Sequence, residues 1–167
     1  LLGELGFENA YALVMKRQRA EALGIRSIAD LARHPELSIA GDYEFFARPE
    51  WAALRDAYGL SFRAERQMQP DFMYAAEAAG EVDVIAGYTS DGQIARYDLE
   101  VLDDPKAAIP PYDAVVLLAP KRANDATLRA ALDLAIGRVA LAADTCALLK
   151  AMRTAARRPW RAGCGSG

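Results

Sequence analysis

Few side chains in this sequence have the types and the spacing that catalysis or metal binding requires. The two cysteines, Cys146 and Cys164, are not spaced as a CxxC metal or redox site, and the single histidine, His34, has no partner that would make it a general base. Glu81 and Asp83 are two residues apart, but their neighbours are apolar and none is a nucleophile. We therefore expect no bound metal, no cofactor and no enzymatic activity.

The sequence also lacks the loops that bind phosphate groups and the turn that presents a catalytic serine. No GxGxxG or Walker spacing follows a predicted strand, and no nucleophile elbow is present. Charge is divided along the chain: residues 1–117 contain 20 acidic and 11 basic residues, whereas residues 118–167 contain 3 acidic and 9 basic ones. This distribution excludes nucleic acid as a partner of the first part. We expect the basic end to be solvated rather than bound to an anionic surface.

The length and composition are those of a globular domain. The chain has 167 residues, of which 53% are hydrophobic and 26% charged. No apolar run approaches the roughly 20 residues that a membrane-spanning helix requires, and no basic and apolar leader opens the sequence. We expect a folded domain without a membrane span.

Short strands and helices are predicted to alternate along the chain. Apolar and β-branched runs predict strands at residues 11–15, 37–41, 82–88, 99–102 and 114–118. Apolar residues at helical spacing predict helices after Lys16 and at residues 27–34, 50–58, 71–79, 92–97 and 125–136. This alternation predicts an α/β fold with a central, mainly parallel sheet flanked by helices.

Several positions and segments within these elements have specific expectations. Ser27 and Asp30 have the spacing of a capping box, and Gly59 stands where a helix ends. Asn124 or Asp125 is expected to cap the helix at 125–136. Phe72 is expected on the buried face of its helix, and residues 114–118 are expected to form a buried strand.

Three segments, taken together and in order, resemble one known family. Residues 5–13 are LGFENAYAL, residues 80–99 are GEVDVIAGYTSDGQIARYDL, and residues 110–114 are PPYDA. They resemble the osmoprotectant-binding proteins of bacterial ABC importers, which capture glycine betaine, choline, carnitine and related compounds. Members of that family commonly show LGFNNTYAL-like, GEVDVIDAYSTDGRIKKYDL-like and PPYYA-like segments. The resemblance extends over about residues 1–137.

The resemblance implies a fold and a division of the chain. It implies a type II periplasmic-binding-protein-like lobe, in which residues 1–118 are the second lobe of a two-lobed solute-binding protein. Residues 119–137 are then a return helix that packs on the first lobe, and residues 138–167 are a divergent basic tail. Because the sequence starts where the second lobe of the family starts, the first lobe is expected to be missing.

Three tyrosines, Tyr11, Tyr88 and Tyr112, match the positions of the family's aromatic cage. A quaternary ammonium has no hydrogen-bond donor, so proteins surround its methyl groups with aromatic faces, each worth about 0.5 to 2 kcal/mol. Each tyrosine lies at the edge of a predicted element, where ligands bind in open α/β sheets. The resemblance therefore implies that these residues hold the ligand. The alternative is that they are ordinary half-buried tyrosines.

The sequence departs from the family pattern close to these tyrosines. Glu8 and Ala10 stand where the family usually has Asn and Thr, and Glu50–Trp51 replaces a usual Asp–Gly pair. The departures at Glu8 and Ala10 concern any hydrogen bonds that the family's side chains at these two positions give the ligand.

Other residues are weaker candidates for ligand contact. Asp91 could face a cation, but an Asp before Gly more often serves a turn. Arg48 could pair with a ligand carboxylate, although an Arg before Pro in a polar loop is usually solvated. Phe45, Phe46 and Trp51 are expected in the core or at a lobe interface.

The function implied by the resemblance is non-catalytic. The chain would hold glycine betaine, choline or carnitine in the tyrosine cage at the lobe cleft and serve an ABC permease on the periplasmic or extracellular face of the bacterial inner membrane. An isolated lobe is expected to bind weakly, and to form a homodimer by pairing of strand 114–118 or by exchange of helix 128–136. The alternatives are a ligand-sensing or interaction module fused to a permease or receptor and, third, a related two-lobed transferase.

Overall fold

The computed structural model describes residues 1–136 and divides the chain into two compact units. One unit is formed by residues 8–112, and the other contains residues 1–7 and the chain from residue 113 on. Within residues 1–136, no helix combines the length and the apolar character of a membrane span. The expectations for the basic end, including Cys146 and Cys164, concern residues outside the described range.

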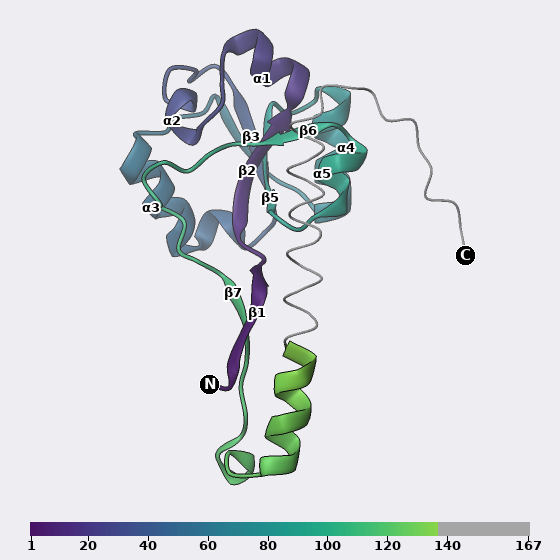
Figure 1. The fold of residues 1–167 in the computed structure, drawn as a ribbon. Helices are drawn as coiled ribbons and strands as arrows, with labels where there is room; N and C mark the ends of the chain where they lie inside the picture. Colours follow the sequence, from purple (N-terminus) through teal and green to yellow (C-terminus); the bar gives the residue numbers. More distant parts are fainter. Residues whose placement is uncertain (137–167) are drawn as a thin grey trace, which may run out of the picture. The chain divides into compact units, whose positions relative to one another are not determined.

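Figure 1 follows the elements in chain order. The strands are β1 (Gly3–Glu8), β2 (Tyr11–Lys16), β3 (Ser38–Gly41), β4 (Ala64–Gln67), β5 (Val84–Tyr88), β6 (Leu99–Val101) and β7 (Asp113–Val116). The helices are α1 (Arg17–Leu23), α2 (Ile28–Leu31), α3 (Pro49–Tyr58), α4 (Pro70–Ala79) and α5 (Gly92–Arg96). Two 3-10 turns, η1 (Phe45–Ala47) and η2 (Pro120–Arg122), and a helical stretch at 126–136 complete the described chain.

Residues 8–112 are built on a five-stranded sheet of order β4-β3-β5-β2-β6. Strand β3 runs parallel to β4 and β5, whereas β2 runs antiparallel to β5 and β6. The predicted α/β class is confirmed, but the sheet is mixed where a mainly parallel one was predicted. The apolar pattern identifies a strand and the face that it buries, but it does not contain the direction of the neighbouring strand.

Each face of this sheet carries its own layer of helices. Along β2, Leu13 and Met15 point into a core shared with α1, α2 and α3, whereas Ala12 and Val14 point into a core shared with α4. Figure 1 shows α3 and α4 on opposite sides of the sheet. All four side chains are nearly inaccessible to solvent. A strand buried on both faces requires the continuous apolar run that predicted β2.

Several local expectations are confirmed. Gly59 ends α3 in a left-handed conformation with φ of 66°, which a residue without a Cβ adopts at little cost. The Asp30 carboxylate accepts hydrogen bonds from the Ser27 amide at 3.0 Å and the Ser27 hydroxyl at 2.9 Å. Asp125 caps the helical stretch at 126–136 by accepting from the Leu128 amide at 3.0 Å. Short polar side chains thus fix helix starts as predicted.

Two burial predictions are wrong. Phe72 is 66% exposed, because α4 turns Met73 and Tyr74 toward the sheet instead. The strand at 114–118 forms as β7, but it is not buried: Val115 is 42% exposed and Leu117, beyond its end, 72%. Strand β7 pairs with β1 in a two-stranded sheet, and such a ribbon covers little of either face. Strand β4 was not predicted, because its residues are mostly polar.

Candidate functional site

The three candidate tyrosines come together within the unit of residues 8–112. The register of β2 and β5 places Tyr11 directly opposite Tyr88. Their rings are stacked with centroids 4.7 Å apart, and their hydroxyls are hydrogen-bonded at 3.1 Å. The Tyr112 ring meets that of Tyr11 edge to face at 6.1 Å. We call these three residues the tyrosine cluster.

The backbone around the cluster holds the tyrosines in place. The Thr89 amide donates to the Ala10 carbonyl at 2.9 Å, which extends the pairing of β2 and β5 beyond their ends. The Asn9 amide donates to the Tyr112 carbonyl at 3.3 Å and ties the segment after the two prolines to the start of β2. Because these contacts join segments about 80 and 100 residues apart, the cluster depends on the whole sheet.

Exposure differs among the three rings. Tyr11 is 4% exposed, since its ring also packs on Phe45 with centroids 5.3 Å apart. Tyr88 and Tyr112 are only partly buried and pack against the edge of the same core. The surface that the cluster offers to a ligand therefore comes mainly from Tyr88 and Tyr112, with Tyr11 as their support.

Two charged residues that flank Pro49 complete the surroundings of the cluster. The Arg48 guanidinium carbon lies 5.6 Å from the centre of the Tyr11 ring, within the range of a cation–π contact, and the same group pairs with Glu44 at 2.7 Å. Glu50, in the first turn of α3, accepts a hydrogen bond from the Tyr112 hydroxyl. The sequence left open whether Arg48 pairs with a ligand carboxylate or is solvated, and it marked Glu50 only as a departure from the family pattern.

Burial and hydrogen bonds shift the pKa values of Tyr11, Tyr112 and Glu50. Burial raises the pKa of the Tyr11 hydroxyl, and its hydrogen bond with Tyr88 adds to the shift. The hydrogen bond between Tyr112 and Glu50 raises the pKa of the tyrosine and holds that of the carboxyl below its usual range. These shifts keep Tyr11 and Tyr112 protonated and Glu50 charged at neutral pH.

Asp91 serves the turn rather than the cluster. Its carboxylate accepts from the Tyr88 amide at 3.2 Å and from the Tyr74 hydroxyl. Gly87 leaves room for this arrangement, because a Cβ at that position would lie 2.2 Å from the Tyr74 oxygen. The sequence preference for a turn role agrees with these contacts.

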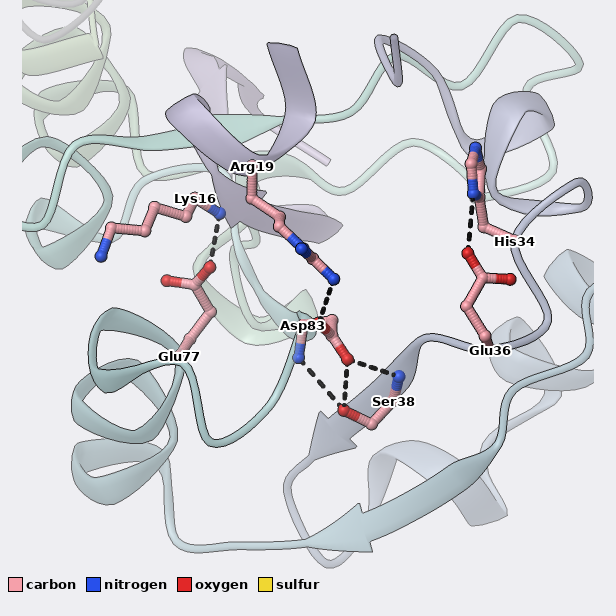
Figure 2. Close-up of polar contacts among 7 residues, drawn as sticks. All are labelled: Lys16, Arg19, His34, Glu36, Ser38, Glu77 and Asp83. Atoms are coloured by element: carbon pink, nitrogen blue, oxygen red, sulfur yellow. Dashed lines mark hydrogen bonds and ion pairs between the residues drawn. The ribbon is translucent and has the colours of Figure 1, made fainter. Parts of the chain in front are cut away.

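The remaining titratable candidates have structural partners (Figure 2). The Asp83 carboxylate accepts from the Ser38 amide at 2.9 Å and hydroxyl at 2.8 Å, and it pairs with Arg19 at 3.4 Å. His34 contacts Glu36 at 2.9 Å on the surface. The partners of both groups lie within the protein, so we assign both groups a structural role.

Glu77 is a buried carboxyl that sequence reasoning did not single out. It is 2% exposed on α4, and one oxygen accepts from the Lys16 amide at the end of β2, as Figure 2 shows. Burial raises its pKa to about 7. The sequence did contain a signal for this burial, because Glu77 follows Met73 by four residues and so lies on the same, apolar face of α4. Within residues 1–136 no group of three or more His, Cys, Asp or Glu side chains is placed to hold a metal ion.

Comparison with known proteins decides the family. The model for the substrate-binding domain of ABC-type glycine betaine transport systems matches residues 1–147. The chain belongs to this family. The resemblance drawn from the sequence is thereby confirmed, and the family is one of binding domains rather than of enzymes.

Relatives of the family share part of their length with this chain. A glycine-betaine-binding protein of Pseudomonas aeruginosa is 37% identical over 121 residues, which are 65% of this chain and 39% of that protein. An ergothioneine transport permease/ergothioneine binding protein of Helicobacter pylori is 30% identical over 119 residues, 70% of this chain and 22% of that protein. The chain spans about a fifth to two fifths of the curated relatives that it matches.

A solved structure supports the fold. The crystal structure of a glycine betaine/carnitine/choline ABC transporter protein is 35% identical, with a TM-score of 0.61 over 66% of this chain and 41% of that one. The expected binding-protein lobe is therefore confirmed as the fold of this chain.

Proposed function

We propose that this chain supplies one lobe of a two-lobed, non-catalytic solute-binding protein for a quaternary ammonium osmoprotectant. Residues 1–118 form the second lobe, 119–137 the return helix and 138–167 a tail, and a first lobe outside these residues completes the site. The observation that carries the proposal is the convergence of Tyr11, Tyr88 and Tyr112 from three distant segments into one cluster. Membership of the glycine betaine family supports the class of ligand.

The chemistry of the cluster suits a trimethylammonium group. Such a group offers no hydrogen-bond donor, so its recognition depends on aromatic faces and on the exclusion of water. The Arg48 guanidinium carbon lies 5.6 Å from the centre of the Tyr11 ring, within the range of a cation–π contact, which supports the proposal. Tyr88 and Tyr112 remain partly exposed and present the ring surface for a ligand. We therefore assign Tyr11, Tyr88 and Tyr112 as the ligand-binding residues.

An isolated lobe leaves the ligand open to water on one side. A cation that contacts the partly exposed rings of Tyr88 and Tyr112 keeps much of its hydration. Each cation–π contact at an exposed site is worth only about 0.5 to 1 kcal/mol. We expect millimolar or weaker dissociation constants for choline and glycine betaine with the 167-residue chain. A sub-micromolar constant for this chain alone would contradict the two-lobe proposal.

The test is an NMR titration of the ¹⁵N-labelled chain with tetramethylammonium, choline and 3,3-dimethyl-1-butanol, the uncharged carbon analogue of choline. We expect shifts of the amides around Tyr88 and Tyr112 with the two cations and at least threefold weaker binding of the alcohol. Tyr88→Ala and Tyr112→Ala should each weaken the response, whereas Tyr43→Ala, at an exposed tyrosine outside the cluster, should not. Equal responses to cation and alcohol would contradict an aromatic cage.

The partner and the location follow from the same proposal. A binding protein of an ABC importer delivers its ligand to a permease subunit, on the periplasmic or extracellular face of the inner membrane. The alternative, a ligand-sensing or interaction module fused to a permease, is favoured by the Helicobacter pylori relative, which is named as a permease and a binding protein together. Ligand uptake by cells that express the intact gene separates the two, because a sensing module would leave uptake unchanged.

We further propose that the isolated chain self-associates as a homodimer. Val115 and Leu117 are apolar and exposed at β7 and just beyond it, and an unprotected strand of this kind pairs readily with another copy. Exchange of the helical stretch at 126–136 is the other route. Light scattering at increasing concentration should show a dimer, and Val115→Lys should shift it toward the monomer. A monomer at millimolar concentration would contradict the proposal.

A further inference from the structure

Glu50 places a carboxylate with an unpaired oxygen beside the tyrosine cluster. Its Oε1 accepts from the Tyr112 hydroxyl, and within residues 1–136 no donor lies in hydrogen-bond reach of the buried Oε2. One neutral hydroxyl does not neutralise a carboxylate. The charge of Glu50 therefore acts on whatever lies against the Tyr112 ring.

The other charges at the cluster do not cancel that of Glu50. Arg48 pairs with Glu44 at 2.7 Å, and its charge also helps to lower the pKa of Glu50. Asp42 adds a further carboxylate, which accepts from the Glu44 and Phe45 amides at 2.8 and 2.7 Å. Asp42, Glu44 and Glu50 thus contribute three negative charges against the one positive charge of Arg48, so these four residues together carry an excess of negative charge.

We propose that Glu50 makes this site prefer ligands with a net positive charge, such as choline, over zwitterionic ligands such as glycine betaine. This inference rests on the proposed function, because it concerns the ligand of the same cluster. Both ligands carry the same trimethylammonium group, so the aromatic contacts do not distinguish them. The difference is the carboxylate of glycine betaine, which the negative region repels, and the hydroxyl of choline, which carries no charge.

The preference can be measured as the ratio of two dissociation constants, determined by NMR titration of the 167-residue chain with choline and with glycine betaine. We expect choline to bind about tenfold more tightly. Glu50→Gln keeps an acceptor for the Tyr112 hydroxyl and removes the charge, and should reduce the ratio to about twofold or less. Glu50→Asp keeps the charge and should retain most of the preference.

A matched control removes the same charge elsewhere. Glu65 is exposed on β4, and Glu65→Gln should leave the ratio unchanged. Melting curves of each variant establish that it is folded before titration. A ratio near one in the parent chain, or a ratio that Glu50→Gln does not alter, would overturn the role of Glu50. The proposed function would still stand in that case if the chain binds tetramethylammonium. Because the isolated chain is expected to bind weakly, the titration extends well above millimolar ligand, and no response there to any cation, tetramethylammonium included, would overturn both.

Discussion

The two ends of β2 place carboxyl groups in opposite environments. Near Tyr11, Glu50 accepts from a tyrosine hydroxyl and its pKa lies below the usual range, so it remains charged beside partly exposed rings. At Lys16, Glu77 lies beneath the strand, 2% exposed, and burial raises its pKa to about 7. The carboxyl beside the partly exposed rings stays charged, whereas burial in the packed core disfavours the charged form of the other carboxyl.

Asp83 shows a third arrangement of a carboxylate in the same unit. Its partners, Ser38 and Arg19, all belong to the protein and use its acceptor positions. Both Asp83 oxygens therefore have partners within the protein, whereas one buried oxygen of Glu50 and one of Glu77 have no hydrogen-bond donor within residues 1–136. The three carboxyl groups differ in their partners although they share the same chemistry.

The largest effect is expected at the tyrosine cluster, when the buried ring of Tyr11 is removed. Tyr11→Ala deletes a ring that packs on Phe45 and Tyr88, and should lower the free energy of unfolding by about 3 to 5 kcal/mol. Denaturation in urea measures it, with the exposed Tyr43→Ala expected within about 0.5 kcal/mol of the parent. A loss below about 1 kcal/mol for Tyr11→Ala would show that the ring is not part of the core.

At the opposite end, Asp83→Ala leaves the Ser38 amide and hydroxyl without their acceptor. We expect a loss of about 2 to 3 kcal/mol, the range for removal of the partner of buried donors. Glu81→Ala, two residues away and exposed, is the matched control and should change stability by no more than about 0.5 kcal/mol. Equal losses for both variants would contradict a specific role of Asp83.

Glu77 predicts a pH dependence whose sign follows from its raised pKa. Its carboxyl titrates at about 7 in the folded protein and near 4.5 when unfolded. The unfolded chain therefore ionises first, and this group lowers stability as the pH rises from 4.5 to 7. Glu77→Gln removes this loss and should be more stable than the parent by about 1 to 3 kcal/mol at pH 8, with little difference at pH 4. If the stability difference between Glu77→Gln and the parent did not change with pH, the raised pKa of the buried carboxyl would be contradicted.

The smallest expected effect isolates one hydroxyl of the tyrosine cluster. Tyr88→Phe removes the 3.1 Å hydrogen bond to Tyr11 and keeps the aromatic ring, so stability should fall by about 0.5 to 1.5 kcal/mol. In the proposed cage the ring provides the cation contact, so binding of tetramethylammonium should change by less than twofold. A large loss of binding would show that the hydroxyl, and not the ring face, contacts the ligand.

Much of the fold could be predicted from local patterns. The apolar run of β2, the glycine at position 59 and the polar cap at Ser27 act over a few residues, and the structure has each of them where it was expected. The prediction of the buried face of α4 was wrong because Phe72 and Met73 are both apolar, and only the position of the sheet decides which of the two side chains is covered. Strand directions were likewise not encoded in the period of the pattern.

By itself, the sequence determined the family, the succession of strands and helices, and the three tyrosines that match the family's cage. The tertiary structure decided how these tyrosines stack, that Arg48 and Glu50 stand beside them, and that Glu77 is buried. The reason is the range of the interactions. Capping and periodicity act between neighbours along the chain, whereas Glu50 and Tyr112 are 62 residues apart and meet only after the sheet and α3 have packed.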